Sequence, residues 1–190
     1  MGKVILTSVG VNNKKGKDLF SSKLCDIELS DRKLLIVTLK KYGISGILRD
    51  AFVDFGYSFS NIFIIESIED CVDNNIYDTY ISEGNVFSIL ELIKKTSLED
   101  VIIDSYNNGA IYMGSSAGAM IAGKDIFCGK DFDKNDREIK DLDALNLVSE
   151  CEIIPHYTKR ELARYIRNTP EIKGRYKKVY NIANDDVIVI

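Results

Sequence analysis

The feature that most constrains this sequence is a set of short runs in which every residue is apolar. Val4–Leu6, Leu34–Val37 and Ile62–Ile65 are such runs, and none of them alternates between apolar and polar residues. Alternation is typical of strands with one face in water, whereas continuous runs are typical of parallel strands covered on both faces. The runs therefore predict a mostly parallel sheet with helices on both sides.

Segments with the spacing of amphipathic helices lie between and after these runs. Apolar residues between positions 44 and 55 fall on one helical face, and Gly56 follows them as a stop signal. The same spacing returns between positions 86 and 93. Ser97 and Asp100 are spaced as a capping box at the start of another helix. Strands that alternate with helices predict an α/β fold.

The last part of the chain carries two more short apolar runs, at positions 178–182 and 187–190. Their proximity in the sequence predicts a closing hairpin of two strands. Because no repeat, low-complexity tract or linker interrupts the pattern, we expect residues 1–190 to form a single domain.

The charge balance limits the classes of partner. The 190 residues include 25 Lys and Arg and 29 Asp and Glu, which gives a formal net charge of −4. Nucleic-acid-binding proteins usually have a basic excess, so we expect neither a nucleic-acid partner nor a polybasic membrane contact. No apolar run approaches the roughly 20 residues that a membrane helix needs. The first residues lack the pattern of a signal peptide, which favours a cytoplasmic protein.

The cysteines do not form a recognisable metal motif. Cys25, Cys71, Cys128 and Cys151 are scattered, no C-x-x-C pair occurs, and the chain has one histidine. Zinc sites need closely spaced cysteine or histidine ligands. We therefore expect no metal and no cofactor, and four reduced thiols in or near the core.

The most informative segment is Gly114–Gly118, which reads G-S-S-A-G and follows an apolar run. The pattern G-x-S-x-G between a strand and a helix is typical of a nucleophile elbow, in which a serine occupies a sharp turn and its close neighbours must lack bulk. Ser116 is the candidate nucleophile. The alternative is a glycine-rich turn that only packs a helix on a sheet.

A serine nucleophile needs a base, which is usually histidine. The single histidine, His156, ends an apolar run, and the carboxyl ends of parallel strands are where α/β folds place their sites. A carboxylate that orients it is expected between the serine and the histidine. Spacing alone does not choose among Asp125, Asp131, Asp133, Asp136, Glu138, Asp141 and Asp143.

Taken together, these segments resemble the dipeptidase E family of serine peptidases, whose relatives include the cyanophycinases. The resemblance rests on Gly114–Ala119, on Pro155–Thr158 forty positions further on, and on Tyr80–Phe87, which is similar to a G-G-N-T-F segment of that family. Asp143–Leu147 resembles its D-A-L-x-L stretch. The resemblance implies a flavodoxin-like, three-layer sandwich like that of the class I glutamine amidotransferases.

The resemblance also implies a Ser-His-Asp mechanism. Ser116 would attack the peptide carbonyl, and His156 would carry the proton. The family's acid follows the serine at a short distance, which by position corresponds to Asp131, with Asp133 or Asp136 as the next candidates.

Further roles follow from the same resemblance. The main-chain N–H groups of Gly84 and Ala117 would form the oxyanion hole, Asn85 would hold the substrate, and Arg160 is the nearest match to the arginine that reads a substrate aspartate. The segment departs from the family at Glu83, where a carboxylate near an oxyanion site is unfavourable unless it points away.

The resemblance thus implies a cytoplasmic serine exopeptidase that cleaves small peptides, in particular dipeptides with an N-terminal aspartate. The sequence does not determine the oligomeric state, and a homodimer is one alternative. One alternative is a catalytically silent relative that binds a small metabolite or a partner protein. An α/β-hydrolase esterase is a second alternative, against which the short chain counts.

Overall fold

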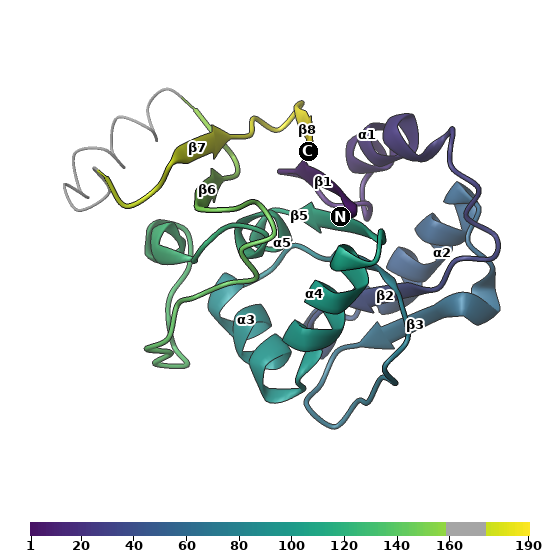
Figure 1. Ribbon diagram of the computed structural model, residues 1–190, viewed down its shortest axis with the longest axis horizontal. Coiled ribbons are helices and arrows are strands. Elements are labelled where there is room, and N and C mark those ends of the chain that lie inside the picture. The colour runs from purple at the N-terminus through teal and green to yellow at the C-terminus, as the bar shows by residue number, and fades with distance from the viewer. Residues whose placement is uncertain (159–173) are drawn as a thin grey trace.

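The computed structural model describes residues 1–158 and 174–190, and its centre is a six-stranded sheet (Figure 1). The strand order is β3-β2-β4-β5-β1-β8, in which the first five strands are parallel and β8 runs antiparallel to β1. This arrangement confirms the predicted α/β fold with a mostly parallel sheet. The strands are β1 (Lys3–Thr7), β2 (Leu34–Val37), β3 (Ile62–Ile65), β4 (Asp78–Ile81), β5 (Ile111–Ser115) and β8 (Val187–Val189).

Helices cover both faces of this sheet, which gives three layers (Figure 1). Successive strand residues point to opposite faces, so Ile5 packs in one core cluster and Val4 and Leu6 in the other. The first cluster lies under α1 and α2, and the second under α3, α4 and α5. The helices are α1 (Lys14–Leu24), α2 (Ser45–Phe55), α3 (Val86–Lys95), α4 (Leu98–Asn107) and α5 (Ala117–Ile121), with 3₁₀ turns η1 (Lys40–Tyr42), η2 (Phe59–Asn61) and η3 (Phe127–Asp131).

The expected closing hairpin is wrong. β7 (Lys178–Asn181) pairs in parallel with β6 (Cys151–Ile154) in a separate two-stranded sheet, whereas β8 pairs with β1. The chain stays with the small sheet as far as Ile182, whose N–H donates to the carbonyl oxygen of Ile154 at 2.9 Å. It then crosses to the free edge of β1, so the two runs complete different sheets.

Of two helix ends predicted from the sequence, the structure confirms the stop at Gly56 and contradicts the cap at Ser97. Gly56 ends α2 with a φ of 115°, as the stop signal predicts. Ser97 does not cap α4 with its side chain, because it adopts a left-handed conformation with a φ of 56°. The first turn of α4 instead carries Glu99 and Asp100, whose negative charges suit a helix N-terminus.

The four free cysteines differ in burial. Cys128 and Cys151 are buried, as expected, whereas Cys25 and Cys71 are exposed.

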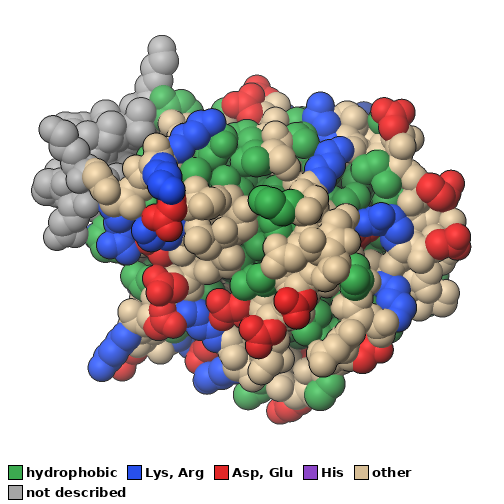
Figure 2. Space-filling model, in the orientation of Figure 1, with side chains coloured by type: hydrophobic (Ala, Val, Ile, Leu, Met, Phe, Trp, Pro, Cys, Tyr) green, Lys and Arg blue, Asp and Glu red, His purple; other side chains and the backbone are tan. Residues whose placement is uncertain are grey.

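No helix within residues 1–158 and 174–190 is long and apolar enough to cross a membrane. On the face shown in Figure 2, acidic and basic side chains are interspersed.

A buried carboxylate joins several segments at the amino end of the sheet. Asp78 is 2% exposed, and Arg32 donates to both of its oxygens at 2.5 Å. Tyr57 donates its hydroxyl hydrogen at 2.8 Å, and the main-chain N–H of Ile111 donates at 2.7 Å. Burial, helped by the carboxylate, raises the pKa of Tyr57, which therefore remains a donor. Asp78 thus holds β5, the end of α2 and the segment before β2 together.

We expect Asp78→Ala to lower the free energy of unfolding by about 3–5 kcal/mol, since it leaves a guanidinium and two further donors without their acceptor. Denaturant unfolding followed by circular dichroism measures this change. Asp104→Ala, on the exposed side of α4, is the matched control and should stay within about 0.5 kcal/mol of the parent. Equal losses in the two variants would contradict the structural role of Asp78.

Candidate functional site

Ser116 occupies a strained turn between β5 and α5. Its φ is 51° and its ψ is −107°, outside the regions that residues with a side chain prefer. A Cβ atom on Gly114 would lie 2.5 Å from the carbonyl oxygen of Gly118, and one on Gly118 would lie 2.1 Å from that of Ile81. Both glycines are therefore required by close backbone approach. The structure confirms the predicted strand–turn–helix context of the serine.

The turn brings Ser116 and His156 into contact. The Oγ of Ser116 lies 2.8 Å from the Nε2 of His156, and both side chains are partly exposed. His156 follows β6, so the pair joins the large and small sheets. Ser115, the neighbouring serine, is buried and its Oγ lies 2.8 Å from the hydroxyl of Tyr80 on the other side of the sheet.

A hydroxyl at the end of β1 fixes the position of the histidine. The Oγ of Ser8 accepts the main-chain N–H of His156 at 2.8 Å and donates to the carbonyl oxygen of Ile182 at 2.7 Å. Ser8 is fully buried, and His156 has a positive φ of 54°. One side chain therefore holds the segment after β6 and the segment after β7 against β1.

The partner of the imidazole on its other side is Asn184, which corrects the expectation for Asp131. The Oδ1 of Asn184 lies 2.9 Å from the Nδ1 of His156. An amide oxygen only accepts, so Nδ1 carries the ring hydrogen. Nε2 then presents its lone pair to the hydroxyl of Ser116. This is the tautomer that a general base requires.

Asp131 lies exposed at the end of η3 and, within the described residues, makes no hydrogen bond to His156. Asp133, the next candidate, accepts the main-chain N–H of Val86 at 2.8 Å. Burial raises the pKa of Asp133, while the charges of Lys41 and His156 act in the opposite direction. Asp133 is thus near the site without touching the imidazole.

The remaining acidic candidates lie away from the imidazole. Asp141 pairs with Lys94, and Asp136 and Glu138 are exposed. Asp125 and Asp143 face one another in an isolated β-bridge.

The two expected oxyanion donors lie on adjacent parts of the sheet edge. Ala117 is the first residue of α5, where a helix leaves N–H groups without an internal partner. Gly84 follows β4, the strand beside β5. Neither N–H donates to an acceptor within the described residues.

Asn85 and Glu83 flank Gly84 and have structural partners. The Oδ1 of Asn85 accepts the N–H of Ser88 at the start of α3, and its Nδ2 donates to the carbonyl oxygen of Lys134, each at 3.0 Å. This amide, expected to hold substrate, is therefore a helix cap. Glu83 points toward the loop after β1, where it accepts from the N–H of Gly10 and the Nδ2 of Asn12. The departure from the family at Glu83 is accommodated in this way.

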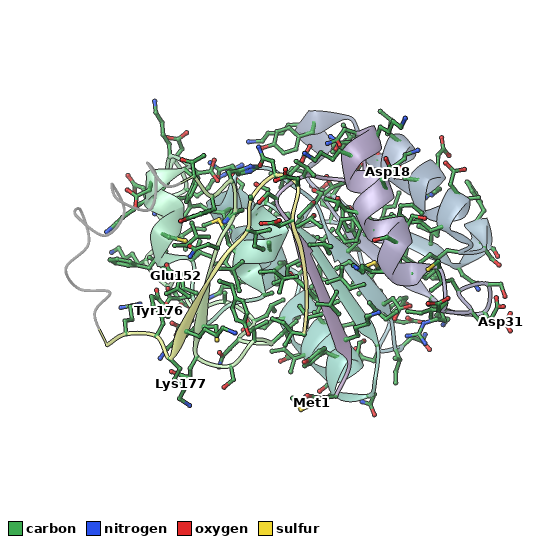
Figure 3. The ribbon with its side chains drawn as sticks, turned by 90° about the horizontal axis from the view of Figure 1, so that it is seen from above. Met1, Asp18, Asp31, Glu152, Tyr176 and Lys177 are labelled. Atoms are coloured by element: carbon green, nitrogen blue, oxygen red, sulfur yellow. The ribbon has the colours of Figure 1, made fainter. Side chains whose placement is uncertain are left out.

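A second buried carboxylate, Asp125, holds the segment that leads into β7. It is 1% exposed and accepts from Arg175 at 2.9 and 3.1 Å and from the hydroxyl of Tyr176 at 2.6 Å. Tyr176 and the buried Glu152 of β6 lie close to one another at the small sheet (Figure 3). This cluster positions β7, and through it the segment that carries Asn184.

The sequence also led to expectations about Arg160 and about metal binding. Arg160 lies outside the described residues. In the parts of the chain that are described, no three His, Cys, Asp or Glu side chains gather as a metal site would require.

Known proteins are similar to this chain in sequence and in fold. Residues 41–190 match peptidase family S51. A protein named peptidase E from Nostoc sp. is 30% identical over 146 residues, which are 75% of this chain and 56% of that protein. An uncharacterized peptidase from Listeria innocua is 29% identical over 113 residues, 58% of this chain and 54% of the relative. The chain thus spans about half the length of the curated relatives that it matches.

Solved structures support the same fold. A protein assigned as a peptidase E from Listeria monocytogenes superposes with a TM-score of 0.74 at 22% identity, covering 100% of this chain and 94% of the other. A peptidase from an acI-B1 actinobacterium gives a TM-score of 0.68 at 16% identity, with 100% and 83% covered.

We expect the Asn184 contact to fix the tautomer of His156. Because the chain has one histidine, selective ¹⁵N-histidine labelling reports a single imidazole. In the neutral form of the imidazole, the parent should carry the ring hydrogen on Nδ1 and none on Nε2, and Asn184→Ala should give a mixture of tautomers. Asp185→Ala, an exposed neighbour, is the control and should match the parent. An unchanged tautomer in Asn184→Ala would contradict the orienting contact.

Proposed function

This chain belongs to peptidase family S51, and we propose that it is a serine peptidase that hydrolyses small peptides. The observation that carries the proposal is the distance of 2.8 Å between the Oγ of Ser116 and the Nε2 of His156, at a turn whose glycines cannot be replaced. The relatives named as peptidases support the same reaction class.

In the proposed mechanism, the Oγ of Ser116 attacks the peptide carbonyl carbon while its proton passes to the Nε2 of His156. The N–H groups of Gly84 and Ala117 bind the oxyanion that forms. The C–N bond then breaks, and His156 returns the proton to the leaving amine. Water activated by the same imidazole hydrolyses the acyl-enzyme and regenerates the serine.

Asn184 has a different electrostatic role from the carboxylate that the resemblance implies. It orients the imidazole through its amide oxygen, but it brings no negative charge to stabilise the imidazolium that forms after proton transfer. The proposed assembly is therefore Ser116, His156 and Asn184. Donors to the oxyanion must supply a larger part of the transition-state stabilisation than in a site with an aspartate.

The proposed substrates include dipeptides with an N-terminal aspartate, as the resemblance to dipeptidase E implies, with Arg160 as the residue that reads the aspartate. A planar guanidinium suits this role because it binds a carboxylate through two parallel hydrogen bonds. A cytoplasmic location and a single domain over residues 1–190 complete the proposal, and the free cysteines fit a reducing compartment.

We predict that Ser116→Ala lowers kcat by about 10⁴- to 10⁶-fold without loss of the fold. Turnover of a dipeptide panel measures this effect. Ser115→Ala is the control, since Ser115 contacts Tyr80 rather than His156, and should retain activity. A catalytically silent protein would hydrolyse no member of the panel.

We predict that Arg160→Ala raises KM for Asp-Leu by roughly 10- to 100-fold, since it removes a charged hydrogen-bonded contact. Asn-Leu is the matched substrate, because it has nearly the same shape without the charge, and its KM should change little. Steady-state kinetics with both substrates checks the prediction. An equal loss for the two dipeptides would assign Arg160 a structural role instead.

A further inference from the structure

A pocket of about 290 Å³ lies at the same edge of the sheet as Ser116. It is formed by the segments that follow β2 and β3, by one side of α3 and by Arg137. We call it the η1 pocket, because η1 (Lys40–Tyr42) supplies its charged rim. In parallel α/β sheets, crevices outside the carboxyl ends of the strands are where ligands bind.

The η1 pocket has an excess of positive charge. Its lining includes four basic and two acidic side chains, which are Lys40, Lys41, Lys95, Arg137, Glu66 and Glu91. Glu91 already forms two ion pairs. The Nζ of Lys95 lies 2.7 Å from its Oε1, and the Nε of Arg137 lies 3.4 Å from its Oε2.

The two lysines of η1 are the cations that remain available. Within the described residues, neither Lys40 nor Lys41 forms an ion pair. Lys41 lies 5.2 Å from the centre of the Tyr42 ring, and both lysine side chains are exposed. Among the lining carboxylates, Glu66 is the one that makes no ion pair within the described residues, and Asp133, outside the lining, also interacts electrostatically with Lys41. An anion entering the pocket therefore meets two free ammonium groups.

Direct contacts connect the η1 pocket to the oxyanion side of the site. The hydroxyl of Tyr42 accepts the main-chain N–H of Asn85 at 3.0 Å. A Cβ on Gly84 would lie 2.7 Å from the Tyr42 ring, so the ring covers this glycine. Asp133 interacts electrostatically with both Lys41 and His156. The η1 segment that carries Lys40 and Lys41 therefore lies next to the expected oxyanion donor Gly84.

The strand order sets the distance between the pocket and the serine. β4 lies between β5, which leads to Ser116, and β2, which leads to Lys40. Neighbouring strands are about 4.8 Å apart, so the ends of β5 and β2 are separated by about 10 Å. An extended peptide advances about 3.3 Å per residue, so this gap corresponds to about three residues.

We propose that the η1 pocket is a substrate subsite that binds a carboxylate carried two to three residues from the scissile bond. The inference rests on the proposed peptidase activity and extends its substrates from dipeptides to acidic oligopeptides. The lysines of η1 supply the attraction, and the negative charge of Glu66 weakens it.

The test uses hexa-alanine peptides with a free N-terminus and an amidated C-terminus, in which one position carries Glu or Gln. Cleavage is followed by mass spectrometry. At one position, two or three residues from the cleaved bond, Glu should give a KM roughly 3- to 10-fold lower than Gln, the modest size reflecting exposed charges. The preference should largely disappear at about 0.5 M salt, where such charges are screened.

Charge variants identify the groups responsible. The double variant Lys40→Gln/Lys41→Gln should lose the preference for Glu with kcat unchanged, whereas Glu66→Gln should strengthen it. Lys33→Gln is the matched control, because Lys33 precedes the opposite end of β2, and it should keep the parent's preference.

Binding of the fluorescently labelled Glu and Gln peptides to Ser116→Ala, with and without the lysine substitutions, tests the pocket independently of turnover. No preference for Glu at any position, or a preference that survives the double variant in both assays, would overturn the subsite. Cleavage of none of the peptides or dipeptides, with lysine-dependent binding intact, would overturn the peptidase function while leaving a carboxylate-binding pocket.

Discussion

The close approach of α5 to the ends of β4 and β5 is the constraint on which the candidate site depends. Gly118 lies against the carbonyl oxygen of Ile81, and Gly114 lies against Gly118 itself, so no side chain larger than hydrogen fits at either position. This contact forces the turn at Ser116 into its unusual backbone conformation. It also places the N–H of Ala117 near the end of β4, where Gly84 follows. The nucleophile and its expected oxyanion donors are thus positioned by backbone packing.

Much of the fold was predictable from the sequence because burial on both faces leaves a direct record. The apolar runs at the positions of β1 and β2 follow from that burial, as does the helical spacing in α2 and α3, whereas the edge strand β3 is apolar although Phe63 is exposed. α1 left no comparable pattern, since only Gly16, Phe20 and Leu24 are buried in it. The hairpin predicted for the last two runs is wrong because adjacency in the sequence suggests pairing, whereas β7 pairs with β6 and β8 with β1.

The sequence predicts the site residues whose chemistry only one or two residue types can supply. It does not predict the residues whose role many types could fill. A nucleophile elbow and a lone histidine point to Ser116 and His156. The group that orients an imidazole needs only an accepting oxygen, so Asn184 serves although no search for carboxylates would find it. Ser8 gave no recognisable signal either, because a serine after a strand is common. Its role arises from two segments that meet it in space.

The bridge made by Ser8 also has a consequence for how the protein folds. Its hydroxyl bonds to residues 148 and 174 positions away. Contacts that close loops of this length carry a large entropic cost and form slowly compared with local ones. Ser116 can reach its turn once β4, β5 and α5 have packed, whereas His156 and Asn184 await the docking of the segments that follow β6 and β7. During refolding, native secondary structure should therefore precede a complete hydrogen-bonded site.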